Sequence, residues 1–101
     1  MNVYTEKVDD KTVKINISGT LGNQIQREFR AAYEQSNASK FIIDVQKAPN
    51  IDSSGLGMLL LLRDFAGGDD SHVEILNCSD HVLDILKITN FEKLFKIPQV
   101  K

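Results

Sequence analysis

Two adjacent hydroxyl side chains, Ser53 and Ser54, follow the carboxylate of Asp52 where the sequence changes from strand-like to helix-like. A serine at the start of a helix can accept hydrogen bonds from the free backbone N–H groups of the first turn. Its hydroxyl also lies near the positive end of the helix dipole, where the same N–H groups would hold a phosphate. The segment therefore predicts either a helix cap or a serine that accepts a phosphate, and residue chemistry alone leaves both open.

Two glycines, Gly55 and Gly57, come directly after the serines. We expect them to give the turn backbone conformations that other residues avoid, and to leave the surface low enough for a partner to approach. The preceding run, Phe41 to Val45, is almost continuously apolar, which is typical of a strand buried on both faces. The following block, Met58 to Leu62, continues the helix. The sequence thus predicts a strand, a tight loop and a helix that present the two hydroxyls.

A serine hydrolase is an alternative for Ser53, but the segment lacks the Gly-x-Ser-x-Gly pattern of a nucleophile elbow. Neither His72 nor His81 has neighbours that identify it as a base, and the two lack the i,i+4 spacing of a metal pair. The single cysteine, Cys78, follows a short apolar strand, so we expect a buried thiol. We therefore expect a protein that is not an enzyme and that needs no cofactor and no metal.

Composition limits the kinds of partner. The 101 residues include 12 basic and 14 acidic side chains, which leaves a formal charge of −2 and no basic cluster. This balance argues against nucleic acid or an anionic membrane and leaves a protein or a small ligand. The chain has room for one domain, over residues 1–101. Its apolar runs are short and its first residues polar, so we expect a cytoplasmic location.

Hydrophobic periodicity predicts the elements that must position the serines. We expect an α/β domain with a mixed, mostly parallel sheet of four to five strands, an N-terminal hairpin and three to four helices. The helix after the serines is apolar nearly all round, which predicts that it lies between the sheet and the third helix, with a partner groove as the alternative. The expected strands are Val3 to Val8, Val13 to Ser18, Phe41 to Val45 and Val73 to Leu76. The expected helices begin at an Asn23–Gln26 capping box, at Ser53 or Ser54, and at a Ser79-Asp80 cap.

The segment Asp52 to Gly57, with the leucine-rich helix after it, resembles the signature of the bacterial anti-sigma factor antagonists, which are stand-alone STAS domains. Two other segments resemble the same family. Gly19-Thr20-Leu21 is similar to its glycine-x-leucine turn, and Ile88 to Phe95 is similar to its C-terminal segment. The resemblance covers most of the chain and implies a protein-binding switch with Ser53 as the phosphoacceptor.

The resemblance also implies partners and a binding surface. An anti-sigma factor or serine kinase would bind the unphosphorylated form, a serine phosphatase would restore it, and the free protein would be a monomer. An adaptor in another pathway, such as a response-regulator cascade for motility or biofilm, or a lipid-transport assembly, is the alternative. The implied partner-binding residues are Gly19, Thr20, Leu21, Gly22, Asn23, Asp52, Ser53, Ser54, Gly55, Leu56 and Gly57.

One position departs from the family pattern. The family usually carries an aspartate directly after the glycine-x-leucine turn, near the phosphoacceptor, and this chain has Gly22. That aspartate is associated with recognition by the kinase and the anti-sigma factor. We therefore expect a different kinase pairing, and we expect Gly22→Asp to speed phosphorylation by a kinase that depends on the carboxylate.

Overall fold

Strands and helices alternate along the chain, because apolar residues recur with a period of two in some segments and about 3.6 in others. The computed structural model describes residues 2–100. Its strands and α-helices are β1 (Val3–Lys7), β2 (Thr12–Leu21), α1 (Gln26–Glu34), β3 (Lys40–Ile51), α2 (Ser53–Phe65), β4 (His72–Leu76) and α3 (Asp80–Ile88). Short 3-10 helices lie at Asn23–Ile25, Gly68–Asp70 and Phe91–Lys93.

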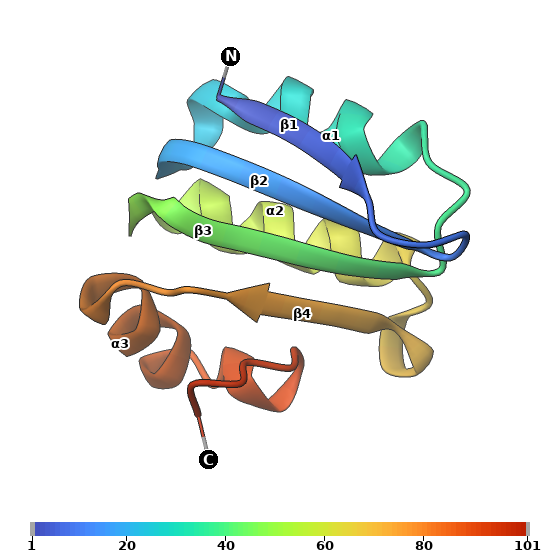
Figure 1. Ribbon diagram of the computed structural model, residues 1–101. Helices are drawn as coiled ribbons and strands as arrows, with labels where there is room; N and C mark the ends of the chain where they lie inside the picture. The colour runs from blue at the N-terminus through green and yellow to red at the C-terminus, as the bar shows by residue number, and fades with distance from the viewer. Residues whose placement is uncertain (1, 101) are drawn as a thin grey trace.

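The strands form one sheet in the order β1-β2-β3-β4 (Figure 1). β1 pairs antiparallel with β2, while the β2–β3 and β3–β4 pairs are parallel. This topology confirms the predicted mixed, mostly parallel sheet with an N-terminal hairpin, packed with three α-helices within residues 2–100. The carboxyl ends of β2, β3 and β4 meet at one end of the sheet, on the left in Figure 1. The segment with the two serines follows β3 at this end.

The third strand is much longer than its apolar run predicted. β3 continues beyond Val45 and through Pro49 to Ile51, which pairs with Leu21 at the end of β2. Pro49 falls inside a register shift, between the partners Lys47 and Asn50, so the ladder does not need the N–H that proline lacks. This extension brings the ends of β2 and β3 side by side.

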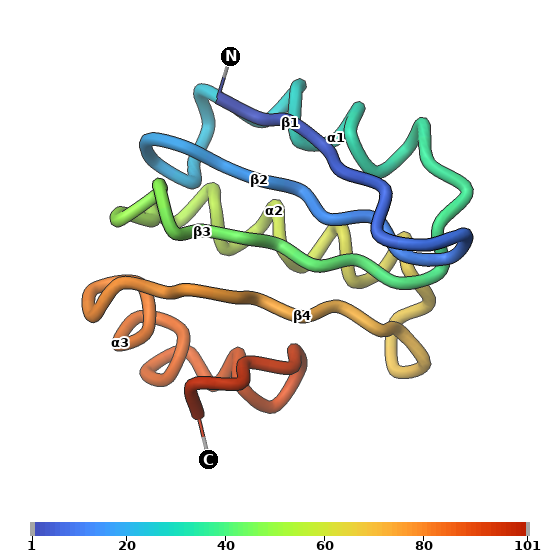
Figure 2. The backbone as a smooth tube through the Cα atoms, viewed as in Figure 1, coloured from blue at the N-terminus to red at the C-terminus, as the bar shows by residue number. Residues whose placement is uncertain are grey.

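Helices α1 and α2 cover one face of the sheet and lie behind the strands in Figures 1 and 2. Side chains on this face, such as Ile15 and Ile43, are fully buried with Leu59 and Leu62 of α2. α2 lies beside α1, whereas α3 lies beyond β4 (Figure 2). The prediction that α2 is wedged between the sheet and α3 is therefore wrong.

The apolar character of α2 has a different cause. Leu60 and Leu61 point away from the core and are 41% and 54% exposed. These two leucines leave an apolar surface on α2 in place of the predicted second buried face.

No helix within residues 2–100 combines the length and the apolarity that crossing a bilayer would take.

The helix starts agree only partly with the prediction. Ser79 caps α3, because its Oγ accepts a hydrogen bond from the Val82 N–H at 3.2 Å. The predicted Asn23–Gln26 capping box is not formed. The chain from Asn23 makes a 3-10 turn instead, and α1 begins at Gln26 with no side-chain cap. The turn uses the Gly22 carbonyl, which accepts from the Ile25 N–H at 3.1 Å.

The C-terminal segment is hydrogen-bonded to β4 and to the turn that precedes α3. The Lys96 N–H donates to the Val73 carbonyl at 3.0 Å, and the Ile75 N–H donates to the Lys96 carbonyl at 2.9 Å. The Gln99 side chain accepts from the Cys78 N–H and donates to the Cys78 carbonyl. The Cys78 thiol is buried, as predicted, and burial raises its pKa to about 11.

Candidate functional site

The residue that caps α2 is Asp52, which leaves β3 with an extended backbone. Its Oδ1 accepts hydrogen bonds from the Gly55 N–H at 3.0 Å and from the Ser54 Oγ at 2.6 Å. The prediction that Ser53 or Ser54 caps the helix is therefore wrong. Aspartate and serine cap about equally well, and Asp52 takes the position because its backbone is extended while Ser53 is already helical. Asp52 binds both the loop backbone and a serine.

The two serines differ in accessibility and in bonding. Ser54 is partly buried and donates its hydroxyl proton to Asp52. Ser53 is exposed, and its hydroxyl takes part in none of the side-chain hydrogen bonds found within residues 2–100. Ser53 occupies the first turn of α2, next to backbone N–H groups that a helix leaves free. The accessible hydroxyl is therefore the one to which the family resemblance assigned the phosphate.

The Asp52 carboxylate is stabilised in its ionised form. The hydrogen bond from the Ser54 hydroxyl lowers its pKa most, followed by the Gly55 N–H, and the backbone of Asn23 adds to the effect. Asp52 is exposed, so burial opposes this shift only weakly. A negative charge consequently stands directly beside Ser53 at neutral pH.

Gly22 lies against the Asp52 carboxylate. A Cβ atom at Gly22 would collide with both carboxylate oxygens and lie 2.6 Å from the Asp52 Cγ. The Gly22 φ of −168° is extended backbone that any residue adopts, so glycine is needed here for space. An aspartate at this position fits only if Asp52 moves, and Gly22→Asp would therefore disturb the cap of α2 as well as add a charge.

Gly55 and Gly57 do not have the backbone role that we predicted, because both lie within α2 and neither has a positive φ. Gly55 is needed for close packing, since a Cβ there would collide with the Leu21 carbonyl and approach the Ile51 side chain to 2.9 Å. Gly57 is exposed, and a Cβ there would meet nothing within 4 Å. Of the two, only Gly57 contributes to a low, accessible surface.

The structure brings together the two segments that the sequence singled out. The Asp52 N–H donates to the Leu21 carbonyl at 3.2 Å, which joins the end of β2 to the start of α2. The predicted glycine-x-leucine turn is part of β2 instead, and Gly19 lies within the strand at a register shift, with a left-handed φ of +92°. Of the predicted partner-binding residues, Leu21, Gly22 and Gly55 are buried beneath the others. The exposed residues are Gly19, Thr20, Asn23, Asp52, Ser53 and Gly57, and Ser54 and Leu56 are half-buried.

A hollow of about 380 Å³ lies beside Asp52. It is lined by Thr20, Gly22, Asn23, Gln24 and Asp52. Sequence reasoning did not include Gln24, because its side chain joins the site only through the 3-10 turn that replaces the predicted cap. The missing side chain at Gly22 leaves this space open.

The histidines lie elsewhere. His72 begins β4 and His81 lies in the first turn of α3, and both are exposed. No hydrogen bond in the described part of the chain joins either histidine to Ser53. Residues 2–100 also contain no group of three His, Cys, Asp or Glu side chains that could hold a metal ion.

A family model, a relative and solved structures all indicate the same fold. Residues 5–98 match the family described as Mlab, STAS domain. A STAS-domain containing protein of Pseudomonas aeruginosa (strain UCBPP-PA14) is 44% identical over 91 residues, which cover 88% of this chain and 90% of the relative.

Three solved structures extend the comparison. A putative anti-sigma factor antagonist from Thermotoga maritima superposes with a TM-score of 0.83 at 18% identity, covering 94% of this chain and 84% of that one. The anti-sigma factor antagonist SpoIIAA in its unphosphorylated form gives 0.75 at 22% identity, covering 94% and 86%. The phosphorylated form of Bacillus SpoIIAA gives 0.68 at 21% identity, covering 94% and 89%. At these identities the solved structures show a shared fold.

Proposed function

Because this chain belongs to the STAS domain family, we propose that it is a protein-binding switch of the anti-sigma factor antagonist type, with Ser53 as its phosphoacceptor. One observation carries the proposal. Ser53 is the exposed and unbonded hydroxyl of the pair, while Ser54 is held by Asp52. The chain is then a substrate of a serine kinase and a serine phosphatase, with no chemistry of its own.

The state that binds is the unphosphorylated one. In that state the surface around Ser53 is low, with Gly57 on the same face of α2 and Gly19 and Thr20 at the neighbouring end of β2. A folded partner can therefore cover the start of α2 without meeting a large side chain there. The partner-binding surface consists of the exposed members of the predicted set, which the buried Leu21, Gly22 and Gly55 support from below.

Phosphorylation would disrupt this surface through charge. A phosphate on Ser53 adds about −1.5 to −2 charges next to the ionised Asp52 carboxylate. The phosphate also competes with Asp52 for the free N–H groups of the first turn of α2. Burying such a group at an interface is unfavourable unless the partner supplies a matching cation, so the modified form should dissociate.

An adaptor role in a different pathway is the second candidate, and the hollow beside Gly22 favours it. Where the antagonist family usually presents a carboxylate, this chain presents a space lined by uncharged polar side chains, with Asp52 at its edge. A partner that recognises this site must fill the space instead of pairing with a second carboxylate. The switch at Ser53 would work in the same way for either class of partner.

The test combines phosphosite mapping with binding. Protein purified from its native host should carry a phosphate on Ser53. A partner captured with wild-type protein should bind Ser53→Ala equally well and should not bind Ser53→Asp. Ser54→Ala is the matched control, because it changes the neighbouring hydroxyl and should keep both phosphorylation and binding. A phosphate found on Ser54 alone, or equal binding by Ser53→Asp, contradicts the proposal.

A further inference from the structure

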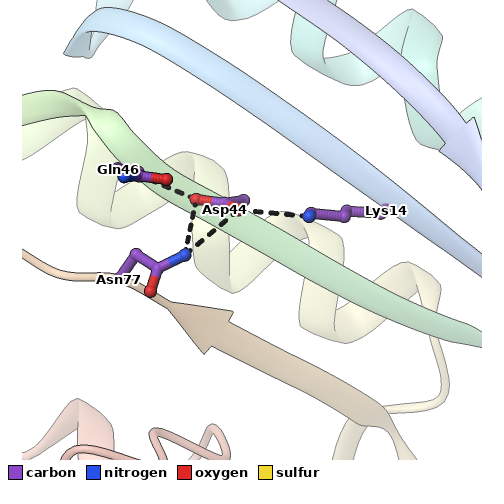
Figure 3. Close-up of polar contacts among 4 residues, drawn as sticks. All are labelled: Lys14, Asp44, Gln46 and Asn77. Atoms are coloured by element: carbon purple, nitrogen blue, oxygen red, sulfur yellow. Dashed lines mark hydrogen bonds and ion pairs between the residues drawn. The ribbon is translucent and has the colours of Figure 1, made fainter.

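A second polar site lies on the opposite side of the sheet from α1 and α2 (Figure 3). Its centre is Asp44, the one charged residue in the apolar run that begins β3 after Lys40, and the residue is only 7% exposed. Side chains from β2, from β3 and from the turn after β4 converge on it in front of the strands. Asp44 precedes Asp52 by a long stretch of β3, so this site is separate from the one at Ser53.

The Asp44 carboxylate is fully partnered. Oδ1 accepts from the Gln46 N–H at 2.9 Å and from the Asn77 Nδ2 at 3.2 Å, and Oδ2 accepts from the same Nδ2 at 3.2 Å. The Lys14 Nζ lies 3.3 Å from Oδ2. Asn77 adopts a left-handed backbone, with a φ of 62°, as it reaches this position. Asp44 therefore has no free acceptor to offer, and its role is to hold Lys14 and Asn77 in place.

Beside this carboxylate, Asn16 has a donor without a partner. Asn16 pairs in register with Asp44 on one side and with Tyr4 on the other. Its Nδ2 is buried and makes no hydrogen bond within residues 2–100. A buried donor without an acceptor is unfavourable and rare in folded proteins. An acceptor from outside the chain would satisfy it.

These groups line a hollow of about 430 Å³. The register between β2 and β3 shifts here, from Asn16–Asp44 to Ser18–Lys47, and the extra residue in β3 places Lys47 at the rim. Bulges of this kind re-aim side chains and are common beside binding sites. The half-exposed ring of Tyr4 forms another part of the wall.

The free groups in the hollow are mainly donors. Lys14 uses one of its three N–H donors on Asp44, and the Lys47 ammonium, the Asn16 amide and the hydroxyls of Tyr4 and Ser18 add further donors. Glu6 is the one lining carboxylate besides Asp44. We propose that this hollow binds the carboxylate or phosphate group of a small molecule, held by Lys14, Asn16 and Lys47, with the organic part of the molecule on Tyr4.

A titration tests the proposal on the full chain by NMR. Inorganic phosphate and succinate serve as probes, each at constant ionic strength set with chloride. One of them should cause saturable shifts of the Asn16 side-chain amide and of the backbone amides around Lys14 and Ser18. The probe that saturates identifies the group as phosphate or carboxylate. Shifts that do not saturate for either probe, or that chloride reproduces, overturn the proposal.

Three variants make the result specific. Lys47→Ala should lower the affinity for the probe that saturates about fivefold, which is the effect of losing one exposed charge contact. Lys87→Ala, which removes an exposed lysine of α3, should leave affinity unchanged. Asn16→Leu should weaken binding about tenfold without lowering the urea midpoint, because the amide donor has no partner in the free protein. Unchanged binding by Asn16→Leu, or by Lys47→Ala, contradicts the proposal.

Discussion

Asp44 and Asp52 lie on β3 and just after it, and each carboxylate accepts hydrogen bonds from the backbone and from a side chain. Their surroundings differ. Asp44 is 7% exposed and has a cation, an amide and a backbone N–H around it, whereas Asp52 is exposed and holds only one serine and the first turn of α2. Losing a partner is costly for the buried carboxylate, while the exposed one can exchange its partners for water.

The difference explains where a switch can be placed. A loop that changes state must be held by bonds that water can replace at low cost, and the bonds of Asp52 meet that condition. The bonds of Asp44 do not, because breaking them leaves a buried carboxylate without its partners. The region around Asp44 is therefore a fixed structure, and the region around Asp52 is the one that the proposed phosphorylation would alter.

The largest expected effect comes from removing the buried carboxylate. Asp44→Ala should lower the free energy of unfolding by about 2–3 kcal/mol, because it removes a buried, fully partnered carboxylate and leaves the half-buried Lys14 ammonium without its counter-charge. Urea denaturation measures this loss, with circular dichroism as the probe. Asp52→Ala is the matched comparison and should cost clearly less. Equal losses for the two variants would remove the distinction drawn between the two sites.

The next effect concerns the space around Asp52. Gly22→Ala should destabilise the protein by about 1–2 kcal/mol, because the added Cβ collides with the Asp52 carboxylate and forces it to move. Thermal or urea unfolding measures the change. Gly57→Ala is the control, since a Cβ there meets nothing, and it should stabilise α2 slightly. An unaffected Gly22→Ala variant would show that Asp52 moves aside freely.

A smaller effect should separate the two serines. Ser54→Ala should cost about 0.5–1 kcal/mol, because it removes a hydrogen bond to the Asp52 carboxylate. Ser53→Ala should change stability by less than about 0.5 kcal/mol, as expected for an exposed side chain without a partner. Parallel urea titrations of both variants measure the difference. A larger loss for Ser53→Ala would mean that Ser53 has a structural bond.

The last effect is a change in pH dependence. Burial raises the pKa of Asp44, but the hydrogen bonds from Gln46 and Asn77 and the contact with Lys14 outweigh it, so the net shift is downward. The Asp44 carboxylate therefore binds a proton more tightly in the unfolded chain than in the folded one. The stabilisation is present above the unfolded pKa of about 3.9 and is lost as the pH falls through the folded value.

Asp44→Asn removes this titration and serves as the measured variant. Its free energy of unfolding should fall less steeply below about pH 4 than that of the wild type, as followed by urea unfolding at a series of acidic pH values. An identical slope for the two proteins would mean that Asp44 has the same pKa in the folded and unfolded chain.

The sequence predicted the sheet, the hairpin and the order of helices, because apolar periodicity and the Ser79 cap are local signals. It did not predict the length of β3, because whether Pro49 ends a strand depends on a register shift with β2. It also misplaced the cap of α2 by one or two residues. Asp52, Ser53 and Ser54 are all good capping residues, and Asp52 is the one with the extended backbone of a cap.

The candidate sites show the same limit. Ser53 was identified because its motif is contiguous. Asp44 is one polar residue in an apolar run, but its partners Lys14 and Asn77 come from other elements and are brought together only by the sheet register. The collision between Gly22 and Asp52 likewise depends on how the ends of β2 and β3 meet.

The pairing of Lys96 with β4 also bears on self-association. An open, mixed sheet of this kind has two edges whose free N–H and C=O groups could recruit a strand from another molecule. On one side the C-terminal segment already occupies those groups of Val73 and Ile75. On the other side, β1 is only five residues long and carries the charged Glu6 and Lys7. The C-terminal residues therefore protect the β4 edge from pairing with another molecule, and a shortened chain that ends before Lys96 would expose that edge.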